Sequence, residues 1–106
     1  MEMQGSDNIS LLRLKGKLDF TTATEFEQKF NIMVSEGGRK FIFDMSEVDY
    51  MSSAGLRLLL IATKKTRGNI VLNGVRDSVK QVIEIAGFES MFKFSKDIDE
   101  AAGLLS

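Results

Sequence analysis

Apolar and polar residues alternate along residues 9–18, whose sequence is ISLLRLKGKL. Leu12, Leu14 and Leu18 share one face at a period of two, which is the spacing of a half-buried β-strand. The opposite face of this predicted strand carries basic residues, namely Arg13, Lys15 and Lys17. The segment therefore predicts a strand with one face in the core and one face in water.

Two further segments are apolar without alternation, at residues 41–43 and 70–72. Short runs of this kind predict central strands that are covered on both faces. Phe92 and Phe94 suggest a last short strand.

Apolar residues recur at helical spacing over residues 22–36, which predicts a helix that ends at the glycine pair after it. Thr22 and Glu25 have the spacing of a capping box, in which each side chain satisfies a free N–H group at the helix start. Helical spacing also predicts helices over residues 53–67 and 75–86, each followed by a glycine. Asp97, in the cap role, begins a C-terminal helix that runs through Leu105.

Strands that alternate with helices in this way predict an α/β fold with parallel strand pairs and right-handed crossovers. The chain of 106 residues has room for a single domain. Hydrophobic residues make up 43% and charged residues 27% of the chain, as is usual for a soluble globular protein.

The charge and the missing residue types exclude several functions. Lys and Arg number 14 against 15 Asp and Glu, so there is no general field that attracts nucleic acid or anionic lipid. No apolar run approaches the roughly 18 residues that span a bilayer, and residues 1–10 lack the pattern of a signal peptide, so we expect a cytoplasmic protein. The chain has no Cys and no His, which excludes thiol and imidazole catalysis and nearly all zinc sites. We expect no enzyme activity, no cofactor and no metal.

The predicted helix over residues 53–67 is more apolar than one buried face requires. A projection at about 100° per residue assigns a core face to Gly55, Leu56, Leu59, Ala62 and Thr63. The same projection gives an opposite stripe of Ser53, Arg57, Leu60 and Lys64, flanked by Leu58 and Ile61. Either the sheet and a neighbouring helix together bury both sides of this helix, or the stripe is a docking surface for a protein.

Two adjacent serines, Ser52 and Ser53, lie at the start of this helix. Ser52 or Ser53 suits the N-cap position, where a serine contributes about 1 kcal/mol. Gly55 suits a position where the helix approaches the sheet closely. The alternative is that a serine hydroxyl at the helix start is exposed and is phosphorylated by a kinase, because the helix dipole and backbone N–H groups there tolerate a phosphate.

The order of motifs along the chain resembles the STAS-domain anti-sigma factor antagonist family. The resemblance rests on GKLD at residues 16–19, DMSEVDYM at 44–51, SAGL at 53–56 and AGF at 86–88. It implies one STAS domain over residues 1–106, with a small mixed sheet and about four helices packed mainly on one face. It also implies a partner switch without catalysis by the domain itself.

In the switch that the resemblance implies, the unmodified protein binds a serine-kinase anti-sigma factor and thereby frees sigma. Phosphorylation of Ser53, with Ser52 as the alternative site, ends this binding, and a PP2C-type phosphatase resets the cycle. We expect a monomer whose partner contacts come from Asp19, after the first long strand, and from the segment around Ser53, namely Ser52, Ala54, Arg57, Leu58, Leu60, Ile61 and Lys64.

The chain departs from the family pattern at Ser52, where Asp is usual, at Arg57, where Gly is usual, and at Lys17, where an acidic residue is common. Arg57 lies one helical turn after Ser53, where it has the spacing to pair with a phosphate. One alternative function is a STAS module that binds a nucleotide or small anion without being phosphorylated, and another is a switch with a non-transcriptional output. An enzyme built on Asp19, Asp44 and Ser53 ranks last, because it lacks an obvious base near neutral pH.

Overall fold

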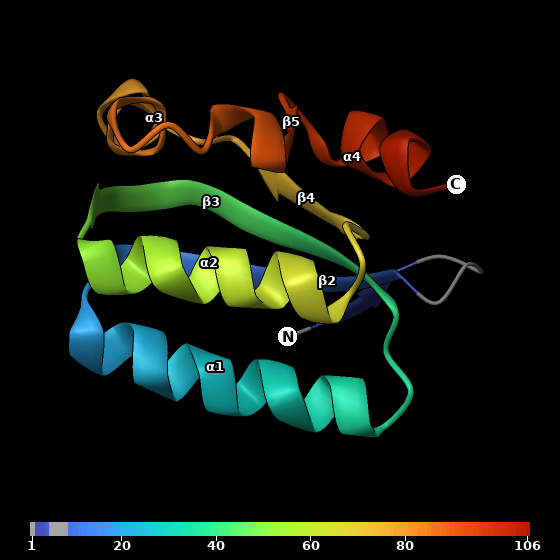
Figure 1. The fold of residues 1–106 in the computed structure, drawn as a ribbon. Coiled ribbons are helices and arrows are strands. Elements are labelled where there is room, and N and C mark those ends of the chain that lie inside the picture. Colours follow the sequence, from blue (N-terminus) through green and yellow to red (C-terminus); the bar gives the residue numbers. More distant parts are fainter. Residues whose placement is uncertain (1, 5–8) are drawn as a thin grey trace.

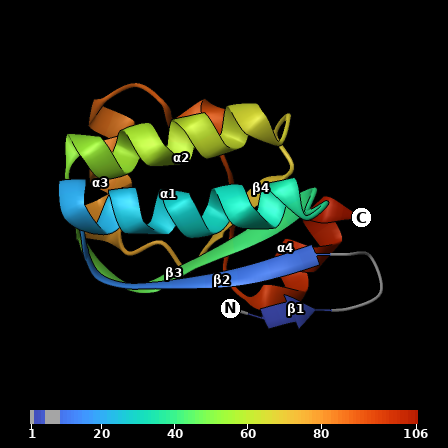
Figure 2. The same ribbon diagram turned by 90° about the horizontal axis from the view of Figure 1, so that it is seen from below.

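The computed structural model describes residues 2–4 and 9–106, so the sequence argument about a signal peptide in residues 1–10 falls partly outside the described residues. Figures 1 and 2 show strands and helices that alternate along most of the chain. In order, the elements are β1 Glu2–Gln4, β2 Ile9–Leu18, α1 Phe20–Ser35, β3 Lys40–Met51, α2 Ser53–Lys65, β4 Ile70–Asn73, α3 Asp77–Ile85, the short 3-10 helix η1 Glu89–Met91, β5 Lys93–Ser95 and α4 Ile98–Leu105. Within residues 2–4 and 9–106, every helix falls short of the length and apolarity that a bilayer crossing needs.

The strands form one mixed sheet in the order β1-β2-β3-β4-β5. β1 runs antiparallel to β2, and the pairs β2–β3, β3–β4 and β4–β5 are parallel. The predicted α/β fold with parallel pairs is confirmed. The paired part of β2 and β3 ends at Leu18 and Met51, which are partners in the register.

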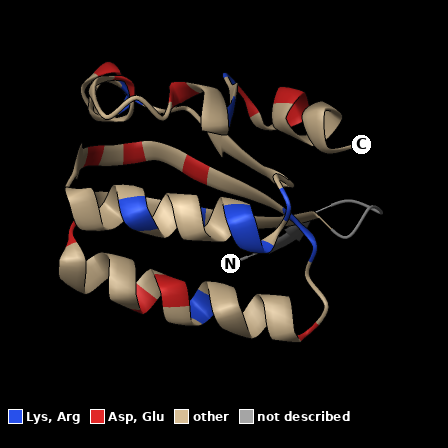
Figure 3. Cartoon of the chain, viewed as in Figure 1, with Lys and Arg blue, Asp and Glu red and all other residues tan. Residues whose placement is uncertain are grey.

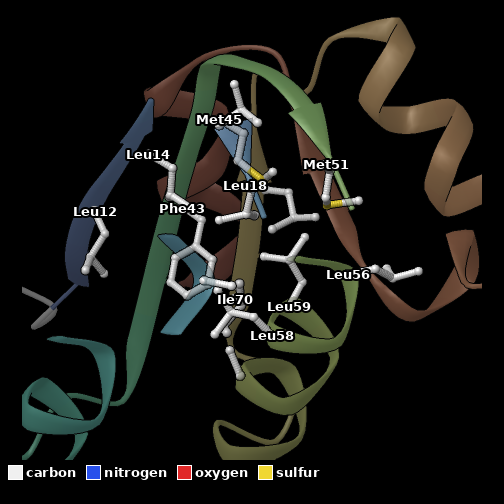
Figure 4. Packing of buried hydrophobic residues seen from close by; sticks show 14 of the residues in the cluster. Leu12, Leu14, Leu18, Phe43, Met45, Met51, Leu56, Leu58, Leu59 and Ile70 are labelled. Carbon is white, nitrogen blue, oxygen red and sulfur yellow. The ribbon is translucent and has the colours of Figure 1, made fainter. Parts of the chain in front are cut away.

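Helices α1, α2 and α3 cover one face of the sheet, and α4 covers part of the other (Figures 1 and 2). The larger core lies under the first three helices, where Phe30 of α1 contacts Phe41 and Phe43 of β3 edge-on at centroid distances of 4.9 and 5.7 Å. Figure 4 shows how strand residues such as Leu14 and Phe43 meet Leu58 and Leu59 of α2. The expected packing of helices mainly on one face is therefore confirmed.

The predicted start of the first helix is wrong by two residues. α1 begins at Phe20, and its N-cap is Asp19, not Thr22. The Asp19 carboxylate accepts a hydrogen bond from the Thr22 amide at 3.1 Å, and the Thr22 hydroxyl accepts one from the Asp19 amide at 2.9 Å. A capping box does exist, but Thr22 takes the role that the sequence analysis gave to Glu25, because Asp19 leaves β2 directly into the helix.

Other boundaries differ because tertiary pairing extends or shortens the local pattern. β3 is 12 residues long, whereas only residues 41–43 were predicted. Its polar second half stays extended because β2 supplies backbone partners as far as Leu18. α3 begins at Asp77 rather than at Val75, and β1 was not predicted.

Candidate functional site

The starts of α1 and α2 lie at the same edge of the sheet. Because Leu18 and Met51 are register partners at the ends of adjacent parallel strands, the next residues, Asp19 and Ser52, begin the two helices beside each other. Figure 1 shows both helix starts at the end of the molecule where β2 and β3 finish. Asp19, Ser52 and Ser53, which were singled out from the sequence, are therefore brought together at this edge.

Ser52 is the N-cap of α2 by position, but its side chain does not cap the helix. Its hydroxyl instead donates to the Leu18 carbonyl oxygen at 3.3 Å, and its amide donates to the same oxygen at 3.0 Å. Ser52 is half-buried, whereas Ser53 is exposed in the first turn of α2. Ser53 is thus the serine whose hydroxyl an approaching protein meets first.

Gly55 brings the first turn of α2 against the end of β2. A Cβ atom at this position would lie 2.6 Å from the Leu18 carbonyl oxygen and 2.8 Å from the Met51 Cγ atom. Contacts this short do not occur for real side chains, so only glycine fits here. The interpretation of Gly55 as a close-packing position is confirmed.

The Asp19 carboxylate acts locally as the cap of α1. The hydrogen bond from the Thr22 backbone amide holds the pKa of the Asp19 carboxyl below its ordinary value, with a further contribution from the Thr22 hydroxyl. Asp19 is therefore ionised near neutral pH, and its negative charge lies one residue before the exposed Phe20. Any role of Asp19 in a partner contact stays a prediction.

A groove with a volume of about 470 Å³ runs between the first halves of α1 and α2. Ser53 and Arg57 stand on its α2 side, and Phe20 and Glu27 stand on its α1 side. Phe20 is 74% exposed, which is unusual for an aromatic side chain and gives the groove an apolar rim. The remaining lining residues are Ala23, Thr24, Ala54, Leu58 and Ile61.

The helical projection of α2 was right for part of the predicted surface and wrong for two leucines. Ala54, Arg57 and Ile61 line the groove with Ser53, as a contact surface requires. Leu58 was expected to flank the exposed stripe, but it is 2% exposed because α1 packs beside α2 on that side. Leu60 was expected on the stripe, but it is half-buried against the main core.

Lys64 is exposed but is not among the residues that line the groove. Phe20 was missed because the predicted helix began at Thr22, and the other groove residues of α1 were missed because the packing of α1 beside α2 was not predicted. With Asp19 as the cap, Phe20, Thr24 and Glu27 fall at the helical spacing of one face, and this was the signal that could have found them.

Asp44 does not join Asp19 and Ser53. It lies seven residues before Met51 along β3, which is roughly 20 Å at the rise of a strand. Its carboxylate accepts from the Ser46 amide at 3.2 Å, from the Asn73 side chain at 3.3 Å and from Arg13 Nε at 3.3 Å. Burial raises the pKa of Asp44, but these hydrogen bonds outweigh burial and leave the pKa below its ordinary value.

The sequence of the chain matches a known domain family. The model of the STAS domain family matches residues 1–101. The protein BtrV of Bordetella bronchiseptica, which is assigned as an anti-sigma factor antagonist, is 32% identical over 105 residues, covering 96% of this chain and 90% of BtrV.

Solved structures share the fold. The tm1081 protein of Thermotoga maritima, also assigned as an anti-sigma factor antagonist, has a TM-score of 0.86 at 19% identity, covering 96% of this chain and 91% of that one. The anti-sigma factor antagonist SpoIIAA in its unphosphorylated form has a TM-score of 0.79 at 20% identity, covering 92% and 87%. The phosphorylated form of SpoIIAA from Bacillus has a TM-score of 0.73 at 18% identity, covering 97% and 96%. Together with the match over residues 1–101, these likenesses lead to one conclusion: this chain belongs to the STAS domain family.

Proposed function

We propose that this chain is an anti-sigma factor antagonist that acts as a phosphorylation-controlled partner switch. In this proposal the unphosphorylated form binds a serine-kinase anti-sigma factor through the groove between α1 and α2, and sigma is thereby freed. The kinase phosphorylates Ser53, the complex dissociates, and a PP2C-type phosphatase removes the phosphate. The chain acts as a monomer in the cytoplasm.

The observation that carries this proposal is the contrast between the two serines. Ser53 is exposed beside the groove, whereas the Ser52 hydroxyl is engaged by the Leu18 carbonyl oxygen. A kinase needs an accessible hydroxyl, so Ser53 is the better phosphate acceptor. The relatives support the same role, since BtrV is assigned as an anti-sigma factor antagonist and SpoIIAA has a phosphorylated form.

A phosphate on Ser53 acts mainly on the partner rather than on the fold. It adds about −1.5 to −2 charges at a helix N-terminus, where the helix dipole tolerates negative charge. Within an interface that includes apolar Phe20 and Ile61, the same charge brings desolvation and steric costs. A loss of about 3 to 4 kcal/mol lowers affinity by several hundredfold, which is enough to exchange partners.

The proposal is tested by measuring the affinity of the cognate serine kinase for three forms of the purified chain. Wild type without phosphate and Ser53→Ala are expected to bind equally, whereas phosphorylated wild type binds several hundredfold more weakly, as about 3 to 4 kcal/mol implies. Phe20→Ala is expected to weaken binding without changing the melting temperature, because the side chain is exposed. Equal affinity of the phosphorylated and unmodified forms would contradict the switch.

A ligand-sensing module is the second candidate, and the groove itself favours it. Its volume of about 470 Å³ falls within the usual range of small-molecule sites. Native mass spectrometry of freshly purified protein separates the two functions. A bound nucleotide or small anion favours the sensor, whereas one phosphate on a peptide of α2 favours the switch.

A further inference from the structure

A concentration of positive charge lies at the end of the molecule opposite Ser53. Arg39 and Lys40 lie where the chain enters β3, and Lys64, Lys65 and Arg67 lie where α2 ends. Figure 3 shows these basic segments gathered at one end of the ribbon. We call these five residues the basic end. Since α2 has 13 residues, the basic end is about 20 Å from Ser53 at the rise of an α-helix.

The basic end has a concave surface. Arg39, Lys65 and Arg67 line a cavity of about 300 Å³ together with Val34 and Asn69. Within the described part of the chain, none of the five cations forms an ion pair. Lys65 donates to the Asn31 side chain at 2.7 Å, which holds its ammonium group between α1 and α2. The cations are therefore available to a ligand from outside the chain.

Arg67 occupies a backbone position that favours glycine. Three helices of this chain, α1, α2 and α3, end in the same hydrogen-bonded motif, in which the residue after the cap is left-handed. That residue is Gly37 in α1, with φ 101°, and Gly87 in α3, with φ 83°. In α2 it is Arg67, with φ 56°. The local structure thus favours glycine, and an arginine stands there instead.

The helix dipole explains only part of the basic end. Lys64 and Lys65 lie in the last turn of α2, where positive charge complements the dipole. The last turns of α1 and α3 contain no basic residue, so this fold does not require one. Arg67 follows the Thr66 cap directly, so the dipole also favours its charge, whereas Arg39 lies three residues past the Glu36 cap of α1 and is not explained in this way. The presence of Arg39 beside Lys65 and Arg67 points to a ligand.

The hydrogen bonds around the cavity indicate which kind of anion suits it. The amides of Gly38, Arg67 and Asn69 are bonded internally, to Met33, Lys64 and Thr66. These backbone groups are therefore not available to cradle a single phosphate, and the positive charges stand on long, flexible side chains. Carboxylates spaced along a peptide can pair with positive charges that stand on separate, flexible side chains. Val34 lines the same cavity and offers an apolar contact to such a peptide.

Nucleic acid suits the basic end less well. Among the described residues that line the cavity, none is aromatic, so bases have no ring on which to stack. Acidic residues are spread over α3 and α4, as Figure 3 shows, and they would repel a long polyanion that ran past the basic end. We propose that the basic end is a docking site for a short acidic segment of a partner protein, separate from the groove at Ser53.

The proposal is tested with a fluorescein-labelled oligoglutamate peptide and the full chain, by fluorescence anisotropy at low salt. We expect saturable binding that weakens as salt is added, because exposed charges are screened. Arg67→Gly is expected to weaken this binding about three- to fivefold, as the loss of one exposed charge contact implies. The melting temperature of the Arg67→Gly protein should stay the same or rise, because glycine fits the left-handed backbone of residue 67.

Two control variants distinguish binding at the basic end from a general attraction of the peptide to the positive charges of the chain. Lys17→Gln removes one positive charge from exposed Lys17 near the end of β2, at the Ser53 end of the molecule, and should leave peptide affinity nearly unchanged. Ser53→Asp should also leave it unchanged, so this result does not depend on the proposed phosphorylation switch. Equal weakening by Lys17→Gln and Arg67→Gly, or no saturable binding at low salt, would overturn the proposal. Tighter binding of inorganic tripolyphosphate or single-stranded DNA than of the peptide would also overturn it.

Discussion

The Leu18 carbonyl oxygen accepts hydrogen bonds from both the amide and the hydroxyl of Ser52, at 3.0 and 3.3 Å. This pair of bonds ties the end of β2 to the start of α2. It also commits the Ser52 hydroxyl to the backbone, so that Ser53 carries the exposed hydroxyl at the groove. The Leu18 carbonyl oxygen is thus the reason why Ser52 has an engaged hydroxyl while the hydroxyl of Ser53 is left accessible.

Ser52→Ala is expected to lower the free energy of unfolding by about 1 kcal/mol, because one half-buried hydrogen bond is lost. Ser53→Ala should change it by less than about 0.5 kcal/mol, since the side chain is exposed. Urea denaturation of both variants measures the difference. Equal stability of the two variants would show that the bond to Leu18 contributes nothing.

Gly55→Ala is expected to destabilise the fold by about 1 to 3 kcal/mol, because the new methyl group would meet the Leu18 carbonyl oxygen and force α2 away from β2. Gly103→Ala is the matched control, since a Cβ there meets no atom within 4 Å. It lies inside α4 and should stabilise the protein by about 0.5 to 1 kcal/mol. Thermal unfolding of the two variants should therefore shift in opposite directions, and a stable Gly55→Ala protein would contradict the close approach.

Arg57→Gln is expected to raise the second pKa of a phosphate on Ser53 from about 6 by a few tenths of a unit, because Arg57 lies one turn away and favours the dianion. Phosphorus NMR of the phosphorylated protein across pH measures this pKa. Lys64→Gln is the control, since Lys64 is on the same helix but does not line the groove. If both variants give the wild-type pKa, Arg57 does not contact the phosphate.

Acid should destabilise the protein through Asp19 and Asp44. The pKa of each carboxyl lies below its ordinary value in the fold, so each contributes stability above the unfolded pKa of about 3.9. That contribution is lost as pH falls through the folded pKa. Asp44→Asn should therefore lose less stability than wild type between about pH 5 and about pH 3, although it starts about 1 to 3 kcal/mol less stable at neutral pH. If wild type and Asp44→Asn lost the same free energy of unfolding as pH falls, Asp44 would not contribute to the acid sensitivity.

The hydrophobic pattern and the capping residues predicted those strands and helices that depend on residues close together in the sequence. β2 spans Ile9–Leu18 as predicted from its alternation, and α4 begins after Asp97, whose carboxylate accepts from the Glu100 amide at 2.8 Å. The same patterns failed for segments whose backbone conformation depends on pairing with a strand that is distant in the sequence. The second half of β3 is polar, and it stays extended because residues such as Glu47 pair with β2, here with Lys15.

The sequence also predicted only part of the candidate site. Ser53 was expected to be exposed at the start of a helix, and it is, although its phosphorylation stays a prediction. Leu58 was misjudged and Phe20 was missed, because a projection of α2 alone contains no information about α1. Only the packing of the two helices makes Leu58 the floor of the groove and leaves Phe20 at its rim.

The proposed switch is tested most directly by incubating the purified chain with its cognate serine kinase and ATP, followed by intact-mass measurement and peptide mapping. Wild type and Ser52→Ala are expected to gain one phosphate on the first turn of α2, and Ser53→Ala none. Labelling of Ser53→Ala to the same extent as wild type would contradict the account.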